Sequence, residues 1–60
     1  MEAIEHKTAA SFQRLAAMRG VNCLVAWSER ERQYVVDGER MGRSIHTLYT
    51  WLEKQPGVKP

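Results

Sequence analysis

The sequence predicts a small α+β domain in which two helices pack against a short antiparallel sheet. Two observations support this fold class. Residues 2–19 and 44–54 place apolar side chains at helical spacing, whereas residues 21–41 alternate apolar and polar side chains as strands do. The short connections between these segments require antiparallel neighbours. The expected order is α-β-β-(β)-α, with either a hairpin or a three-stranded meander between the helices.

The first helix is expected over residues 2–19, which are rich in alanine, the strongest helix former. Gly20 follows it as the expected C-terminal cap. We expect one stripe of this helix to cover the sheet. At helical spacing that stripe consists of Ile4, Thr8, Ser11, Phe12, Leu15 and Met18.

A second face of the same helix carries an alanine every seven residues, at Ala3, Ala10 and Ala17. Small side chains let another helix approach closely, so this ridge is a candidate face for self-association. Alanine is also common in helices simply because it loses no side-chain entropy there. The sequence leaves both explanations open.

The strands are expected over residues 21–27 and 32–36, with a short third strand over residues 39–41. The Asp37-Gly38 dipeptide between the last two strands is typical of a tight turn, since glycine tolerates a positive φ angle. The first strand carries apolar residues on both of its faces, so we expect both faces to be covered. We expect Trp27 or Tyr34 to lie on the sheet face away from the helices, where a second protomer could cover it.

The last helix is expected from Ser44 or Ile45 to Lys54, with Ser44 as its N-cap. Gln55-Pro56-Gly57 ends it, and the tail over residues 55–60 is expected to be mobile. The residues at the spacing of one buried face are Ile45, Leu48, Tyr49 and Leu52.

The chain of 60 residues is long enough for one domain, taken as residues 1–60. Domains this short usually gain stability from disulfides, metals or self-association. Cys23 is the single cysteine, which excludes an intramolecular disulfide, and together with His6 and His46 it is too little for a closed zinc site. We therefore expect no metal or cofactor, and a homo-oligomer, most simply a dimer.

The sequence also bears on location and catalysis. No apolar run approaches the ~20 residues of a membrane span, and Glu2 and Glu5 stand where a signal peptide needs basic residues. A lone free cysteine fits a reducing compartment, so we expect a cytoplasmic protein. Cys23 lies in an apolar strand, where cysteine is usually inert, and no phosphate loop or nucleophile motif is present. We therefore expect the protein not to be an enzyme.

The segment from Gly38 to Leu52 resembles the turn and second helix of helix-turn-helix DNA-binding proteins. Its last six residues, 47–52, look like the recognition helices of transposase-type domains. The resemblance implies that Arg43, Ile45, His46 and Thr50 face the major groove. The sequence departs from the family at Asp37 and Arg43, where the family has apolar residues, and residues 33–41 also fit a strand and turn. The positions that match are Gly38, Met41, Gly42, Ser44, Leu48 and Trp51.

The charge balance is mildly basic, with nine Lys and Arg against seven Asp and Glu, a net charge of +2 and a pI of about 9.0. In a strand, Arg30 and Arg32 would share one side, and arginine suits bidentate contacts to phosphate. We therefore expect a small regulatory protein that binds nucleic acid, with DNA favoured. The candidate contacts are Arg30, Arg32, Arg40, Arg43, His46 and Thr50.

The alternative is a protein-binding inhibitor or adaptor that acts on a larger protein. Tryptophan and tyrosine are common among interface hot spots, and small residues allow close helix packing. Its candidate contacts are Ala3, Ala10, Ala17, Tyr34 and Trp51. Either role suits a bacterial or phage accessory protein, and the sequence identifies neither the partner nor the number of subunits.

Overall fold

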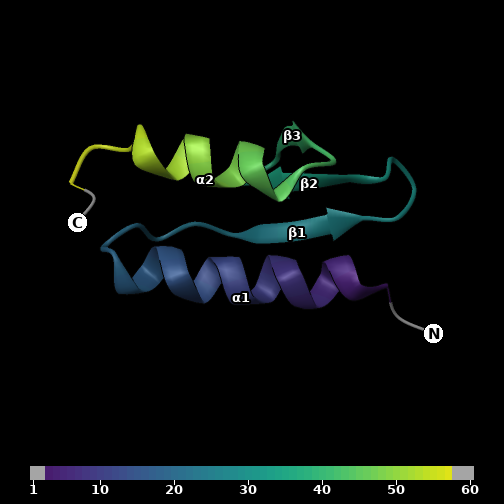
Figure 1. Ribbon diagram of the computed structural model, residues 1–60, viewed down its shortest axis with the longest axis horizontal. Coiled ribbons are helices and arrows are strands. Elements are labelled where there is room, and N and C mark those ends of the chain that lie inside the picture. Colours follow the sequence, from purple (N-terminus) through teal and green to yellow (C-terminus); the bar gives the residue numbers. More distant parts are fainter. Residues whose placement is uncertain (1–2, 58–60) are drawn as a thin grey trace.

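The computed structural model describes residues 3–57 and confirms the predicted α+β order, with the three-stranded alternative formed (Figure 1). Within these residues no helix combines the length and the apolar content that crossing a membrane requires. The elements are α1 (Ile4–Met18), β1 (Val25–Ser28), β2 (Gln33–Val36), β3 (Glu39–Gly42) and α2 (Ile45–Glu53).

Helix α1 ends where the sequence predicts, at Gly20. This glycine has φ +88°, and its N–H donates to the Ala17 carbonyl while the N–H of Val21 donates to the Ala16 carbonyl. This pair of bonds is the Schellman arrangement, which satisfies carbonyls that the helix itself leaves open. The expected start at Glu2 lies outside the described residues.

The sheet is antiparallel with the order β1-β2-β3. Asp37 and Gly38 both have positive φ angles, +49° and +84°, and form the predicted two-residue turn between β2 and β3. Asp37 also fixes the position of Leu24, the residue before β1. Its N–H donates to the Leu24 carbonyl and its Oδ1 accepts the Leu24 N–H, both at 2.9 Å. The β2–β3 pairing is shifted between Tyr34 and Val35.

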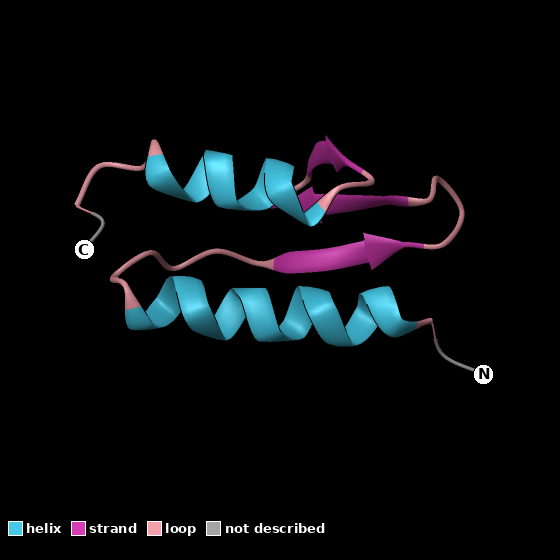
Figure 2. Ribbon diagram, viewed as in Figure 1, coloured by secondary structure: helices cyan, strands magenta, loops and turns pink. Residues whose placement is uncertain are grey.

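Both helices cover the same face of the sheet, with α1 running alongside β1 (Figure 2). The register pairs Val25 with Val36 and Trp27 with Tyr34, so these four side chains point to one side. The expectation that Trp27 or Tyr34 lies on the opposite face is therefore wrong. Tyr34 is 3% exposed, and its ring packs edge-on against Trp27 with centroids 4.8 Å apart.

The core is narrower than the predicted helical stripes. Phe12 lies in it and is flanked by Ala9 and Ala16, whereas Ile4 and Met18 at the ends of the predicted stripe are 74% and 82% exposed. The reason is that α1 packs between β1 on one side and α2 on the other, so its buried side is centred on Phe12. Ile4, Thr8, Ser11 and Leu15 instead border a groove with Ile45 and Tyr49 of α2, and Met18 lies at the exposed end of α1.

Among the described residues, no helix or further strand covers the outer face of the sheet. Leu24 is 72% exposed, Ala26 is exposed and Val35 is half-buried. The expectation that the first strand is covered on both faces is therefore wrong. Strand β1 is also shorter than predicted. Gly20 and Val21 cap α1, and the residues up to Leu24 connect this cap to the sheet.

Helix α2 begins at the predicted cap, where the Ser44 hydroxyl accepts the His46 N–H at 3.1 Å. Leu48 and Leu52 on its inner side are fully buried. Of the tail expected to be mobile, residues 58–60 lie outside the described residues. Gln55 is attached to the end of α2, because its side-chain amide donates to the Trp51 carbonyl and its backbone N–H to the Leu52 carbonyl.

Replacing Leu48 by Ala tests the assignment of the two faces, with Leu24→Ala as the matched control. Leu48 is 0% exposed, so its truncation leaves a cavity and should lower the free energy of unfolding by about 2–5 kcal/mol. Leu24→Ala should change it by less than about 0.5 kcal/mol. Urea unfolding followed by circular dichroism measures both. An equal loss for the two variants would show that Leu24 is covered in solution and would contradict an open outer face.

Candidate nucleic-acid interface

One end of the molecule collects the beginnings of both helices and the β1–β2 connection (Figure 1). The up-and-down order of the elements produces this arrangement, since β1 runs back along α1 and α2 runs back from the end of β3. Two contacts fix the connection in place. His6 Nε2 lies 3.2 Å from Glu29 Oε1, and Arg40 Nε lies 2.6 Å from Glu31 Oε2. We call this region, with Arg30, Arg32, Arg43 and His46, the basic end.

The β1–β2 connection carries two of the predicted arginines, Arg30 and Arg32, and both are exposed. Residues 29–32 form turns, not a strand, and Arg32 has φ +53°. The expectation that strand alternation places the two arginines on one side is therefore wrong. The turn is held by Ser28 Oγ, which accepts the Glu31 N–H, and by Glu31, which accepts a hydrogen bond from the Gln33 amide at 2.8 Å.

Arg40 is committed to a contact within the protein. Its Nε and one terminal nitrogen contact both carboxylate oxygens of Glu31, at 2.6 Å and 3.1 Å. This two-point pairing ties the β1–β2 connection to β3 and neutralises the charge of Arg40. Arg40 therefore fits a positioning role for the connection better than a direct contact with nucleic acid.

The beginning of α2 carries the remaining predicted contacts. Arg43 immediately precedes the Ser44 cap and is exposed, as is His46 in the first turn. Thr50 lies one turn further along and is half-buried, with its hydroxyl donating to the His46 carbonyl at 3.0 Å. Arg43 and His46 are thus exposed to solvent at the start of α2, whereas the Thr50 hydroxyl is hydrogen-bonded within the helix.

The resemblance to helix-turn-helix proteins does not extend to the structure. Those proteins place a helix before the turn that leads into the recognition helix. Here the residues before Gly42 form strand β3, which pairs with β2. The local match therefore reflects a turn, a cap and an amphipathic helix. Residues 33–41 form two strands and the turn between them, not a helix.

The predicted protein-binding residues do not form one surface. Ala10 and Ala17 are exposed on α1 and Ala3 is half-exposed, but Tyr34 is in the core and Trp51 is a partly buried residue packed against it. Burial raises the pKa of Tyr34 above its ordinary value; the Glu5 carboxylate adds to the shift, while the Thr8 side chain opposes it. Tyr34 is therefore not available to a partner in the folded protein.

Some basic side chains of the basic end are paired with an acidic side chain, and others are not. Among residues 3–57 the contacts between basic and acidic side chains within 4.0 Å are His6 with Glu29 and Arg40 with Glu31. Arg32 shares a shallow depression with the acidic residues Glu5 and Glu29 but contacts neither within salt-bridge distance. Arg30, Arg32 and Arg43 therefore remain exposed cations without an ion-pair partner among the described residues.

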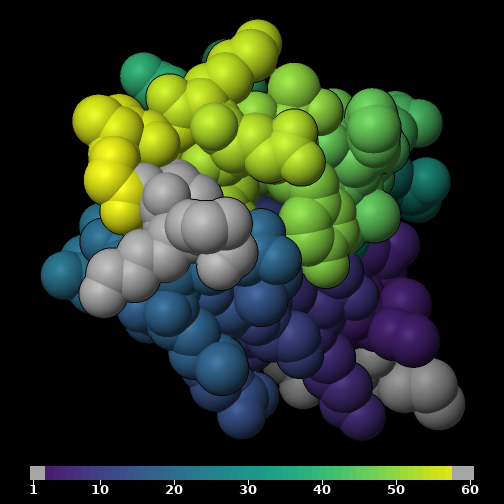
Figure 3. Space-filling model, turned by 60° about the vertical axis from the view of Figure 1, so that its left-hand side comes forward, coloured from purple at the N-terminus to yellow at the C-terminus, as the bar shows by residue number. Residues whose placement is uncertain are grey.

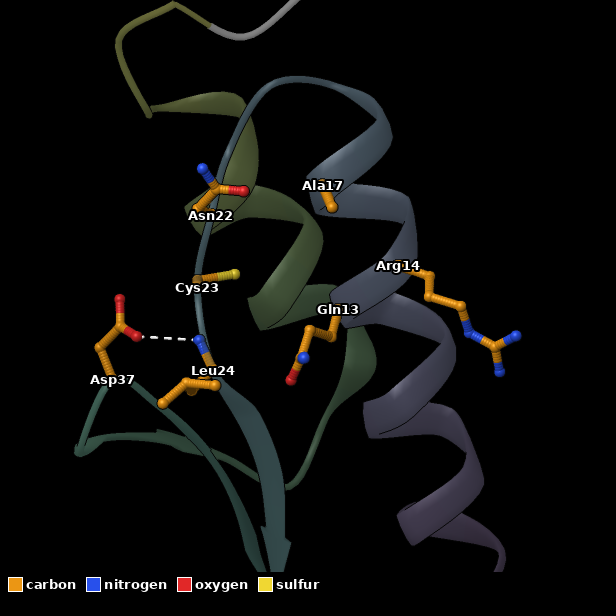
Figure 4. Close-up of a pocket in the computed structure, with 7 residues that line it drawn as sticks. All are labelled: Gln13, Arg14, Ala17, Asn22, Cys23, Leu24 and Asp37. Carbon is orange, nitrogen blue, oxygen red and sulfur yellow. Dashed lines mark hydrogen bonds between the residues drawn. The ribbon is translucent and has the colours of Figure 1, made fainter.

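A separate hollow of about 330 Å³ lies between α1 and the chain that leads into β1 (Figure 4). Asp37 points to the Leu24 N–H and Gln13 accepts the Val25 N–H, whereas Arg14 extends away from the hollow. Burial raises the pKa of the Cys23 thiol above its ordinary value, and Asp37 adds to the shift. The described residues contain no cluster of three or more metal-ligating side chains.

Two features of the site escaped the sequence analysis. The Glu31–Arg40 pair was missed, because hairpin pairing places Arg40 opposite Val35, and the fold of the 29–32 turn is what brings Glu31 to it. A groove between α1 and α2, with Ile4 and Tyr49 at its surface, was also missed. Both residues were assigned to the core because helical spacing alone does not distinguish the centre of a buried face from its edge.

Comparison of the chain with protein families, with curated proteins and with solved structures finds no match. No role is therefore transferred from a relative, and each residue is assigned by its own chemistry and surroundings.

Cys23 should react slowly in the folded protein. Because Cys23 is 9% exposed and its thiolate is disfavoured, alkylation at pH 8 should be about 100-fold slower than in urea-unfolded chains. Since the folded thiol holds its proton more tightly than the unfolded one, the free energy of unfolding should fall as pH rises above about 8.5. Cys23→Ala should reduce this fall. Iodoacetamide labelling followed by mass spectrometry measures the rates, and equal rates for folded and unfolded chains would contradict the burial.

Proposed function

We propose that the protein is a small, non-catalytic, cytoplasmic regulatory protein that binds nucleic acid, with DNA the favoured partner, through the basic end. The observation that carries the proposal is the grouping of Arg30, Arg32 and Arg43 at the end where both helices begin. These arginines are exposed and have no salt-bridge partner among residues 3–57. Exposed arginines in such a position suit phosphate groups, which they bind in a bidentate way.

The helix ends add to the attraction. The beginning of a helix carries a partial positive charge, and the start of α2 is flanked by Arg43 and His46. The Glu31–Arg40 pair supports the same role indirectly, because it holds the connection that carries Arg30 and Arg32 against β3. The contribution of the pair is geometric, since an exposed ion pair adds little stability.

The expected binding is directed mainly at the phosphate backbone. Helix α2 has nine residues, its inner side is buried, and β3 replaces the supporting helix that a recognition helix would need. Phosphate contacts position a protein on a duplex but carry little sequence information. A homodimer, which the small size of the chain favours, would double the number of phosphate contacts.

Salt dependence of DNA binding is the direct test. Fluorescence anisotropy with a labelled random duplex should show affinity that falls steeply between about 50 and 200 mM NaCl. Three phosphate contacts per subunit predict a slope of log K against log salt concentration of about −2.7 for each subunit bound, since each contact contributes about −0.9. Arg30→Ala, Arg32→Ala and Arg43→Ala should each make the slope shallower by about 1 for each subunit bound.

Arg14→Ala is the matched control, because it removes the same charge from an exposed position on α1. It should leave the slope unchanged. Absence of binding at the lowest salt concentration, or an equal effect of Arg14→Ala and Arg43→Ala, would contradict the proposal. The first outcome would favour the alternative role of a protein-binding inhibitor or adaptor.

A further inference from the structure

The shallow depression at the basic end has a volume of about 420 Å³. Its lining comes from the start of α1, the end of β1 and the β1–β2 connection, and consists of Ala3, Glu5, Trp27, Glu29 and Arg32. It shares no lining residue with the groove between the helices, which lies on the side where α2, in green to yellow, packs against α1, in purple to blue (Figure 3). A depression of this volume is large enough for a planar ring system such as a nucleobase.

Trp27 gives the depression an aromatic wall that is held in position. The side chain is half-buried, and the ring of Tyr34 meets it at 64° with centroids 4.8 Å apart. Because Tyr34 is only 3% exposed, this contact fixes the indole against the core. The part of the indole that stays open lines the depression. An aromatic ring that is already fixed loses little conformational entropy when a ligand stacks on it.

Arg32 adds a cation to the same depression. It is exposed and has no acidic partner within 4.0 Å among residues 3–57. Proteins bind single-stranded nucleic acid with this combination, in which a base stacks on an aromatic ring and a basic side chain takes the phosphate. A duplex keeps its bases stacked and paired, so it offers this depression only its phosphates.

The carboxylates of the depression favour one kind of base. Glu29 has one oxygen 3.2 Å from His6 Nε2, whereas Glu5 is half-buried and is not part of an ion pair among the described residues. A carboxylate accepts hydrogen bonds and does not donate them, so Glu5 matches the amino group of cytosine and not the carbonyl oxygen that thymine has in its place. Carboxylates also repel phosphate, which directs the backbone to Arg32 and the base edge to Glu5.

We propose that the depression binds one unpaired nucleotide of single-stranded DNA, with the base stacked on Trp27, its amino group on Glu5 and its phosphate on Arg32. This inference rests on the proposed function and narrows the ligand to a single strand that contains cytosine. A duplex still binds through the exposed arginines of the basic end, but without the stacked base it binds more weakly.

Fluorescence anisotropy with three labelled DNAs tests the proposal. The probes are a strand of deoxycytidine and a strand of deoxythymidine, each of about 12 nucleotides, and a random duplex of the same length. At one low salt concentration the cytidine strand should bind about tenfold more tightly than either the thymidine strand or the duplex. Equal affinity for the cytidine strand and the duplex, or tighter binding of the thymidine strand, would overturn the proposal.

Two substitutions at Trp27 separate stacking from folding. Trp27→Leu keeps apolar bulk without a ring and should weaken binding of the cytidine strand about tenfold, whereas Trp27→Phe keeps a ring and should weaken it less than about threefold. Trp27→Leu should leave the duplex affinity within about twofold, because the duplex does not reach the indole. Equal losses for Leu and Phe, or an equal loss for the duplex, would show that Trp27 serves only the fold, and the proposal would be wrong.

Glu5→Gln tests the contact with the base. It should bring the two strands within about twofold of each other, because an amide also donates to the carbonyl oxygen of thymine. Glu53→Gln is the matched control, since Glu53 is exposed on α2 and does not line the depression, and it should leave the tenfold preference intact. Equal effects of the two variants would contradict the role of Glu5.

The same probes distinguish failure of this inference from failure of the proposed function. A duplex that binds with steep salt dependence, together with a cytidine strand that binds no more tightly, overturns the nucleotide site alone. Absence of binding to all three DNAs at the lowest salt concentration overturns both.

Discussion

Asp37 holds the first strand in register with the other two. Its backbone N–H donates to the Leu24 carbonyl, its side chain accepts the Leu24 N–H, and its left-handed φ angle forms the turn into β3. The three strands have only four residues each, so few other bonds oppose a slip. A slip of one residue would turn every side chain of a strand to the other face of the sheet.

The remaining architecture depends on that register. It directs Val25, Trp27, Tyr34 and Val36 to one face, and α1 and α2 then bury this face together. Both helices lie on one side of the sheet, with α1 against β1 and α2 against β3 at the opposite edge. They run in the same direction, so their beginnings meet at the same end of the molecule (Figure 1). The arginines of the β1–β2 connection and of the β3–α2 junction are therefore brought to one end, and the groove forms where the helices lie side by side.

The parts of the fold that depend on local chemistry could be predicted from the sequence. Gly20, the Asp37-Gly38 turn and the Ser44 cap work through neighbouring residues, and all three occur where predicted. The parts that depend on tertiary packing could not. Tyr34 was assigned to the wrong face, because alternation shows which residues share a face but not which face the helices choose.

The candidate site shows the same division. The exposure of Arg30 and Arg43 follows from their positions in connections, whereas the pairing of Arg40 with Glu31 requires the hairpin to be folded. Ile4 and Tyr49 had the spacing of core residues, and only the packing of α1 against α2 shows that they border a groove.

Mapping a DNA titration onto the backbone amides by NMR tests the central claim most directly. With a random duplex at low salt concentration, the amides of Arg30, Arg32, Arg43 and His46 should shift together. Those of Leu24 and Val35, on the outer face of the sheet, should not move. The shifts should disappear as salt is raised. Shifts confined to the outer face of the sheet, or none at any salt concentration, would contradict binding through the basic end.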